Sequence, residues 1–231
     1  MNQIHPTAII GPGVELGEDN IVGPHAVLYG PTVLGNGNWI GPHVVIGTPG
    51  ESKGNPHPPL WDKPGPGPAI TIGDDNIIHE FVAIQASLSD QTKIGDRCFI
   101  MDKAHVPHDA QLGNDVTVAC SVMIGGHSRI GDGANLGLAS VLHQFMVVGA
   151  GAMIGMNSVV TRPIPPFSIA YGSPARVKGA NRVGMSRAGI APNVVEALHT
   201  AFVSEIELDS DVMAPELQAA FDWFNQAVGA H

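Results

Sequence analysis

Aromatic residues, charged residues and cysteines are all scarce in this chain of 231 residues. Aromatics make up 5% of it, charged residues 14%, and there are two cysteines. No run of about 20 apolar residues exists to span a bilayer, so we expect no membrane insertion. The formal net charge of -10 argues against nucleic-acid binding.

The cysteines and the N-terminus indicate the compartment. Cys98 and Cys120 stand in apolar surroundings without metal-ligand spacing, which predicts small buried hydrophobes in a reducing compartment. The first six residues, MNQIHP, lack the basic start and apolar core of a secretory signal. We therefore expect a cytoplasmic protein.

Aliphatic residues, in contrast, are plentiful and recur every six residues. The 29 glycines and 19 prolines predict many tight turns between short strands. Twenty-two aliphatic residues keep one phase, in three runs: Ile10, Leu16, Val22, Leu28, Leu34, Ile40 and Ile46; Ile72, Ile78 and Ile84; and Ile94 to Val160 without a gap.

A period of six predicts a parallel β-helix over residues 1–185, a mostly β fold. Each hexapeptide forms one flat side and a turn, and three sides close a coil of eighteen residues, so we expect about seven coils with the repeated aliphatic side chain pointing inward. The next residue is often glycine, where a side chain would crowd the bend.

Two segments interrupt the period, and a helical pattern follows it. Residues 48–70 form a long Pro/Gly-rich loop, which is either a lid over a site or disordered, and Gln85 to Lys93 form a shorter loop. A helical domain is expected over residues 186–231. Its helices begin at Pro192 and near Pro215, with apolar faces that pack on the solenoid's end or on another subunit: Val195, Leu198 and Phe202, then Leu217, Phe221 and Phe224.

Several of the eleven histidines converge on one edge of the predicted prism. Positions eighteen apart share an edge, and His108 is followed there by Gly126, Gln144 and Arg162. His127 and His143 fall one step either side of this column, and His105 lies three residues before His108. Imidazoles near neutral pH suit proton transfer, and Asp109 could fix the tautomer of His108.

Two other interpretations of these histidines stay open. Histidines on solenoid faces can simply fill an interface, as we expect for His25 and His43. Three imidazoles can also bind zinc, but the nearest members lie on different coils without fixed ligand spacing, so no metal site is predicted.

Basic residues gather late in the chain. Five of the eleven lie between 162 and 187, where there is no Asp or Glu: Arg162, Arg176, Lys178, Arg182 and Arg187. Such a patch predicts a phosphate-bearing ligand or an acidic carrier protein, although a solvated turn segment would look the same.

Three histidine motifs resemble one family. His105-Val-Pro-His108-Asp109, Gly125-Gly126-His127 and Val141-Leu142-His143-Gln144-Phe145 are similar in order and spacing to the UDP-N-acetylglucosamine O-acyltransferases of lipid A biosynthesis, most clearly over residues 94–190. The resemblance implies a left-handed parallel β-helix with a C-terminal helical domain. It also implies a homotrimer with sites between subunits.

The resemblance also implies residue roles. His108 is the general base toward a sugar hydroxyl, Asp109 orients it, and the Gly126 amide stabilises the oxyanion. The acyl donor is a thioester on phosphopantetheine, delivered by acyl carrier protein, and no bound cofactor is implied. The remaining positions line the acceptor and acyl pockets (His127, His143, Gln144), contact the nucleotide (Asn181, Arg187) or limit acyl length (Met156), where a methionine predicts a short or medium chain.

The chain departs from the family's pattern around the acceptor. Gln85 replaces a usual histidine near the sugar nucleotide, Val183 replaces an acidic residue, and Asp62 and Lys63 are possible equivalents of the acceptor-binding carboxylate and lysine. The part of the solenoid before the loop at 48–70 has about one coil fewer than in the family. Acyl transfer is thus better supported than the acceptor's identity.

Two alternatives remain. Residues 160–177 also resemble the closing segment of coenzyme A-dependent hexapeptide acetyltransferases acting on sugars, whose coenzyme phosphates the basic patch would hold. A non-catalytic solenoid scaffold is the third hypothesis, and it predicts that His108→Ala changes nothing.

Overall fold

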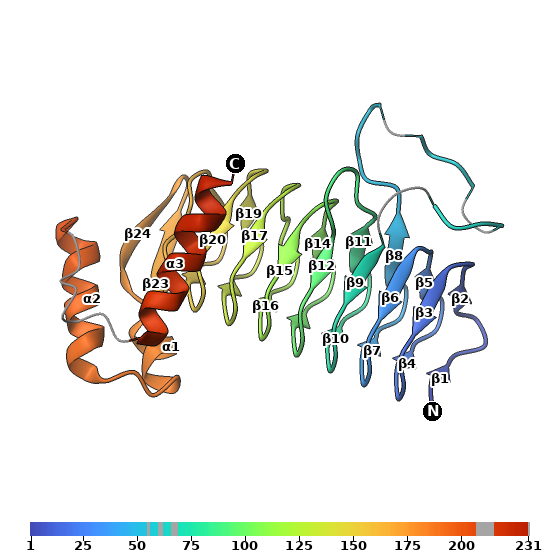
Figure 1. Cartoon of the computed structure of the whole chain (residues 1–231), viewed down its shortest axis with the longest axis horizontal. Coiled ribbons are helices and arrows are strands. Elements are labelled where there is room, and N and C mark those ends of the chain that lie inside the picture. Colours follow the sequence, from blue (N-terminus) through green and yellow to red (C-terminus); the bar gives the residue numbers. More distant parts are fainter. Residues whose placement is uncertain (55, 60–61, 66–68, 207–214, 231) are drawn as a thin grey trace.

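A parallel β-helix forms most of the molecule and runs along its long axis (Figure 1). The computed structural model describes residues 1–54, 56–59, 62–65, 69–206 and 215–230. Three helices follow the β-helix: α1 (Arg182–Arg187), α2 (Pro192–Ser204) and α3 (Pro215–Gly229). Among these described residues, no helix is long and apolar enough to cross a membrane.

Three sheets form the sides of the prism. The first face consists of β1 (Gln3–Ile4), β4 (Ile21–Val22), β7 (Trp39–Ile40), β10 (Ile77–Ile78), β13 (Phe99–Ile100), β16 (Thr117–Val118), β18 (Asn135–Leu136), β21 (Met153–Ile154), β23 (Ser168–Gly172) and β24 (Ala175–Ala180). The second consists of β2 (Ile9–Ile10), β5 (Val27–Leu28), β8 (Val45–Thr48), β11 (Ala83–Gln85), β14 (His105–Val106), β19 (Val141–Leu142) and β22 (Val159–Val160). The third consists of β3 (Val14–Leu16), β6 (Thr32–Leu34), β9 (Ile70–Ile72), β12 (Lys93–Ile94), β15 (Gln111–Leu112), β17 (Arg129–Ile130) and β20 (Val147–Val148).

The solenoid has more turns than the period alone indicated. Nine parallel strands stack on the first face, and only the last strand, β24, pairs antiparallel. The predicted number of about seven coils is therefore too low. The added turns lie at the ends, where β1 precedes Ile10, the first residue counted in the period, and β23 follows Val160, the last.

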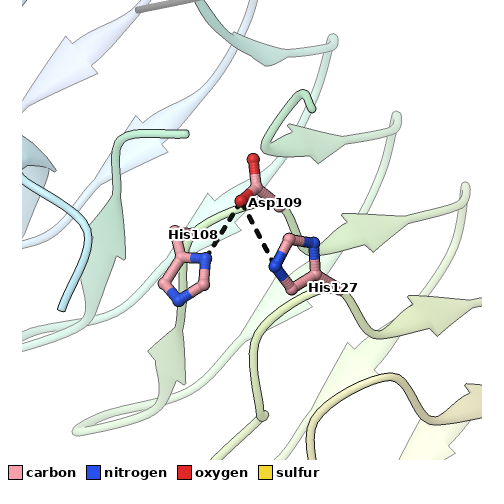
Figure 2. Close-up of side chains that lie close together, drawn as sticks. All are labelled: His108, Asp109 and His127. Carbon is pink, nitrogen blue, oxygen red and sulfur yellow. Dashed lines mark hydrogen bonds and ion pairs between the residues drawn. The ribbon is translucent and has the colours of Figure 1, made fainter. Parts of the chain in front are cut away.

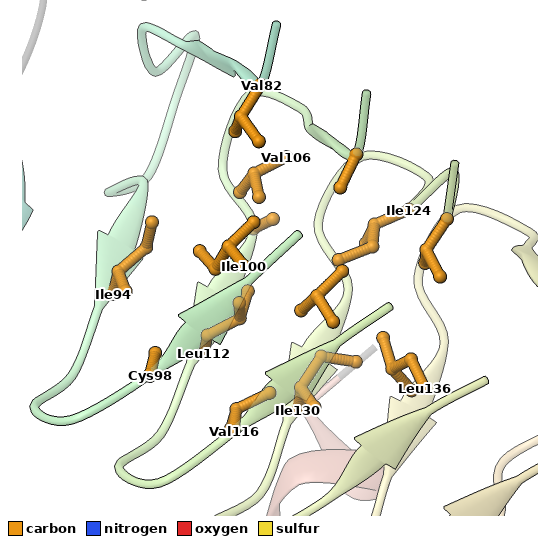
Figure 3. Packing of buried hydrophobic residues seen from close by; sticks show 14 of the residues in the cluster. Val82, Ile94, Cys98, Ile100, Val106, Leu112, Val116, Ile124, Ile130 and Leu136 are labelled. Atoms are coloured by element: carbon orange, nitrogen blue, oxygen red, sulfur yellow. The ribbon is translucent and has the colours of Figure 1, made fainter. Parts of the chain in front are cut away.

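The repeated aliphatic residues fill the interior. Ile100 pairs with Ile78 below it and Val118 above it, and all three are fully buried. Figure 3 shows the same stacking for Ile94, Leu112 and Ile130, which come from successive coils. Burying one such side chain stabilises the fold by about 1.5–3 kcal/mol, and each coil adds further aliphatic side chains that make the same contribution. The predicted inward phase is confirmed.

Asparagine and aspartate side chains join the coils at the turns. Inside the prism, Oδ1 of Asn38 accepts the amide of Asn76 at 2.9 Å, and Oδ1 of Asn76 accepts the amide of Cys98 at 2.8 Å. In a second ladder, on the outside of the prism, the Asn114 amide donates to the Asp132 carboxylate. Gly113 must be glycine there because a Cβ would collide with the same carboxylate. These ladders satisfy turn amides that the strands leave free.

The helices close the C-terminal end. In α2, Val195 and Leu198 are buried against β24, as predicted, and Leu217 of α3 joins the same cluster. Helix α3 lies along the third face beside β20 (Figure 1). Helix α1 was not anticipated, and it spans the boundary expected between residues 185 and 186.

The two cysteines differ in their surroundings. Cys98 is buried as predicted, its thiol lies 3.1 Å from the Gly113 carbonyl oxygen, and burial raises its pKa to about 11. The prediction is wrong for Cys120, which stands at a corner and is only partly buried. A hydrogen bond to the Asp102 carboxylate raises the pKa of that thiol.

Candidate active site

The corner between the second and third faces carries the histidine column. His108 follows β14, and the cross-coil register of His105, Met123 and Val141 places residues eighteen apart directly above one another. Gly126 therefore stands one coil above His108, as the sequence predicted. The strands fix this arrangement because neighbouring coils are hydrogen-bonded about 4.8 Å apart.

A carboxylate and two imidazoles meet at this corner (Figure 2). Nδ1 of His108 lies 3.0 Å from Oδ2 of Asp109, and Nε2 of His127 lies 3.6 Å from the same oxygen. The two imidazole rings are edge to face, with centroids 5.2 Å apart. Asp109 is buried, whereas both imidazoles are partly exposed, so the solvent side of the cluster is formed by histidine.

The loop at 86–92 holds Asp109 as an anion. Oδ1 of Asp109 accepts hydrogen bonds from the main-chain amides of Leu88 (3.1 Å), Ser89 (3.2 Å) and Asp90 (2.8 Å). Burial alone would raise the pKa of Asp109, but the Asp90 amide, His108 and the other two amides act against it, and the pKa lies below its usual value. Nothing in the sequence signalled this support, because main-chain groups supply it.

Thr92 fixes the turn from the other side. Its Oγ1 accepts the amide of Asp109 at 2.8 Å, in a turn where Asp109 adopts a left-handed conformation with φ of 60°. Oγ of Ser87 in turn accepts the Thr92 amide at 2.8 Å. Loop and corner are thus one hydrogen-bonded unit.

This geometry sets the tautomer of His108. A carboxylate can only accept, so a neutral His108 places its ring proton on Nδ1, toward Asp109. Nε2 is then left with a free lone pair and can remove a proton from a bound hydroxyl. The pair has the arrangement of a general base and its orienting carboxylate.

Gly126 lies directly against the His108 ring. A Cβ at this position would be 2.7 Å from Cε1 and 3.0 Å from Nε2 of His108, so any side chain would displace the imidazole. Within the described part of the chain, the Gly126 amide donates to no acceptor, while its carbonyl accepts from Phe145. A free main-chain donor therefore borders the His108 ring.

His105 contributes a buried nitrogen without a partner. Its Nε2 makes no hydrogen bond to any described residue and is shielded from solvent. Burial lowers the pKa of His105, and His108 adds to this, although Glu51 opposes both. His105 is neutral at pH 7 and has an open position for a ligand atom.

The start of the long loop borders the same cluster. A Cβ on Gly50 would be 2.8 Å from Cβ of His108, and the Glu51 amide donates to Oε1 of Gln85 at 3.4 Å. Gln85 is buried at the end of β11. The sequence placed a loop over 48–70, and its first residues do reach the histidines. Figure 1 shows described residues of this loop extending beyond the coils, and its Gly65 amide returns to the solenoid, where it donates to the Gly30 carbonyl oxygen at 2.7 Å.

Two other predicted site residues lie outside the cluster of His108, Asp109 and His127. His143 and Gln144 are exposed on the next coil, and Nδ1 of His143 lies 3.1 Å from the Gln144 carbonyl oxygen. Phe145 stacks on His127, with ring centroids 4.6 Å apart and planes 3° apart, a contact that no sequence pattern indicated.

Met156 lies at a different corner from the histidines. It follows β21 on the first face and is 67% exposed, whereas the histidine corner follows the second face. Met123, Val141 and Leu138 are also exposed on or beside the second face. An apolar surface therefore extends from the Met156 corner across the face that carries His105.

The basic residues do not form a free patch of five charges. Arg162 is exposed on the histidine corner, while Arg176 and Lys178 border a groove on β24 that also contains Glu205. Arg182 pairs with Glu196 at 2.7 Å. Helix α2 thus brings carboxylates to the patch that counting along the chain could not anticipate.

The residues expected to contact a nucleotide lie on α1 or at its N-cap. Asn181 caps α1, accepting the Gly184 amide at 3.1 Å and donating to the Gly151 carbonyl at 3.0 Å, and it lines a cavity of about 570 Å³ that Trp223 also borders. Val183 is exposed on α1, and Arg187 is exposed at its end. Asp62 and Lys63 are exposed in the long loop.

The chain is similar to known proteins in both sequence and fold. Residues 91–126 match the bacterial transferase hexapeptide family (six repeats), and residues 164–206 match domain 2 of UDP N-acetylglucosamine O-acyltransferase. An acyl-[acyl-carrier-protein]--UDP-N-acetylglucosamine O-acyltransferase from Thiobacillus denitrificans is 39% identical over 215 residues, covering 87% of this chain and 83% of that protein. The chain belongs to the UDP-N-acetylglucosamine O-acyltransferase family.

Other members of the family are also similar to this chain in sequence or in structure. The relative of the same name from Alkalilimnicola ehrlichii is 39% identical over 136 residues, an alignment that spans 58% of this chain and about half of that protein, 53%. The crystal structure of a UDP-N-acetylglucosamine acyltransferase from Bacteroides fragilis superposes with a TM-score of 0.79 at 29% identity, over 96% of this chain and 94% of that one. The predicted left-handed parallel β-helix with a short C-terminal helical segment is confirmed.

Proposed function

We propose that this acyltransferase moves an acyl group from an acyl carrier protein thioester to a hydroxyl of UDP-N-acetylglucosamine, as its relatives are named to do, in lipid A biosynthesis. The observation that carries the proposal is the dyad of His108 and Asp109 beside the free amide of Gly126. These are the groups that acyl transfer needs: a base for the hydroxyl and a donor for the oxyanion.

The reaction follows from the positions of these groups. Nε2 of His108 takes the hydroxyl proton while the oxygen attacks the thioester carbonyl carbon. The carbonyl oxygen gains negative charge and accepts the Gly126 amide hydrogen bond, worth about 3 kcal/mol in comparable sites. The intermediate then expels the thiolate, which takes the proton from His108, so base and donor return to their starting states.

The acceptor sugar would bind against the second face. His105 would offer its unpartnered Nε2 to a sugar oxygen, and Gln85 and Glu51 would border the sugar at the start of the long loop. His127, held against Phe145, would border the acyl thioester, with His143 and Gln144 above it. Asp62 and Lys63 would approach the sugar from that loop, and Asn181 and Arg187 would serve the nucleotide.

The donor would arrive on a phosphopantetheine arm. Arg162 continues the histidine column, and Arg176, Lys178 and Arg182 would attract the acidic carrier protein. Because Met156 lies at another corner, it can limit acyl length at the histidine site only if a second copy presents that corner. The proposal therefore includes a homotrimer with shared sites, acting in the cytoplasm without a bound cofactor.

One assay tests the proposal. Purified protein is mixed with UDP-N-acetylglucosamine and either acyl carrier protein thioester or acetyl coenzyme A, and a single turnover is followed. We expect transfer from the carrier protein, and a loss of about 10²–10⁴-fold in His108→Ala. The control His43→Ala changes an exposed histidine of another corner and keeps full activity. Transfer from coenzyme A alone would assign the chain to sugar acetylation instead, and no transfer from either donor would contradict the proposal.

A further inference from the structure

The cluster of His108, Asp109 and His127 has a second chemical capability. Its three potential ligand atoms all lie within 4.8 Å of one another. We propose that it binds one Zn²⁺ ion and that the bound ion switches acyl transfer off. The inhibition, though not the binding, rests on the function proposed above.

The distances suit a tetrahedral ion. Zinc holds nitrogen and oxygen ligands at about 2.0–2.2 Å, which places neighbouring ligand atoms about 3.3 Å apart. Oδ2 of Asp109 lies 3.0 Å from Nδ1 of His108 and 3.6 Å from Nε2 of His127. Small rotations of the two imidazoles would therefore bring all three atoms around one ion.

The surroundings of Asp109 favour a single ligand atom. Its Oδ1 is fully engaged by the amides of Leu88, Ser89 and Asp90, so only Oδ2 is offered to an ion. Such outer hydrogen bonds orient metal ligands and tune their affinity. Two imidazoles with one carboxylate select zinc-like transition metals over Mg²⁺ and Ca²⁺, which prefer oxygen.

Metal binding and base catalysis exclude one another at His108. Catalysis needs the ring proton on Nδ1, where Asp109 accepts it, and the lone pair on Nε2. An ion on Nδ1 displaces the proton from that nitrogen to solvent and binds the Nδ1 lone pair, and the neutral ring then carries its one proton on Nε2. The nitrogen that should accept the hydroxyl proton has become a donor, so the metal-bound protein cannot begin the reaction.

The first test measures binding without any substrate. The whole chain is stripped with chelator and titrated with Zn²⁺ in equilibrium dialysis and with Co²⁺ by visible absorption, at neutral pH. We expect one tight site and the strong bands of tetrahedral cobalt. His127→Gln should raise the dissociation constant by about 100-fold or more, because losing even a residue that only supports a ligand costs about 10–100-fold.

Control variants separate this site from adventitious histidines. His143→Gln alters the next coil of the same corner, and His43→Gln alters the stacked pair of His25 and His43, so both should bind Zn²⁺ like the parent. Thermal unfolding verifies that each variant is folded. A parent-like affinity in His127→Gln, or loss of the tight site in His43→Gln, would overturn the proposed site.

The second test connects occupancy to activity. Zn²⁺ should inhibit acyl transfer over the same concentration range in which it binds, EDTA should restore the rate, and His127→Gln should resist inhibition relative to its own metal-free rate. Tight binding without inhibition would disprove the switch. An inactive parent would instead count against the proposed transferase, while the binding titration would still decide the metal site.

Discussion

At the scale of single residues, the tautomer and the orientation of the His108 imidazole depend on its two neighbours, Asp109 and Gly126. Asp109 sets its tautomer from one side, and Gly126 gives it room on the other. We expect a change in the size of Gly126 or in the charge of Asp109 to alter the orientation of this imidazole. Two predictions test these two dependences separately.

Gly126→Ala should disable the enzyme without unfolding it. The added methyl carbon would meet Cε1 of His108 at 2.7 Å, so the ring must turn away from Asp109. We expect the turnover number to fall by about 10²–10⁴-fold, the loss that removal of a general base brings, while the thermal midpoint changes little. Gly229→Ala, where a Cβ meets nothing within 4 Å, is the matched control. Full activity in Gly126→Ala would mean that the His108 orientation is unimportant.

Asp109→Asn should change how stability depends on pH. The pKa of Asp109 is lowered in the folded state, so its contribution is present above the ordinary value of 3.8 and is lost as pH falls through the folded value. At neutral pH the variant should be about 1–3 kcal/mol less stable, because hydrogen bonds to a buried charge are lost. Urea unfolding at several pH values measures this. A difference that does not shrink in acid would contradict the assignment.

At the scale of elements, the loop at 86–92 supports the corner that carries His108. Three amides of the loop bind the Asp109 carboxylate, and Thr92 binds the Asp109 amide. The loop therefore helps to position Asp109 at this corner. Loosening it should affect the base indirectly.

Thr92→Val provides the corresponding test. Valine keeps the shape of the buried side chain but leaves the Asp109 amide without its acceptor, which should cost about 1–3 kcal/mol of unfolding free energy. The turnover number should fall while KM stays close to the parent value. Thr117→Val, an isosteric change on a partly exposed strand residue of the first face, is the control. Unchanged stability in Thr92→Val would show that this hydrogen bond does not support the corner.

Much of this arrangement could be predicted from the sequence, because it follows from periodicity. The step of six located the inward aliphatics, and a coil of eighteen placed Gly126 above His108. The two loops and the helices at Pro192 and Pro215 were also foreseen, from breaks in the period and from apolar spacing.

Other features had no local signal. The amides around Asp109 belong to residues whose side chains are irrelevant to the bond, and Glu196 reaches Arg182 only through the packing of α2. Helix α1 is six residues long, too short for a hydrophobic period, and only its Asn181 cap could have indicated it. Cys120 appeared apolar in sequence, but the corner exposes it.

At the scale of the whole molecule, the candidate ruler and the base lie on different corners of one prism. Met156→Gly should allow longer acyl chains if a second copy brings that corner to the histidines. The measurement is the ratio of rates for long and short acyl donors, which should rise in this variant. It should stay unchanged in Met153→Ala, which alters a partly exposed methionine on the preceding strand. An unchanged ratio in Met156→Gly would remove Met156 from the acyl pocket.

The eighteen-residue register of the coils also makes the molecule modular. The strand pairings that set the spacing at the histidine corner each join a coil to its immediate neighbour, although Gly50 reaches His108 from the coil of β8, two coils earlier. Whole turns before β8 can therefore be added or removed without altering the spacing of these strands. Deleting a complete turn before β8 should shorten the rod and keep the strand spacing at this corner, whereas deleting residues 109–126 would remove Asp109 and Gly126 themselves. The length of the rod and the spacing of the groups at the histidine corner are therefore set by different parts of the chain.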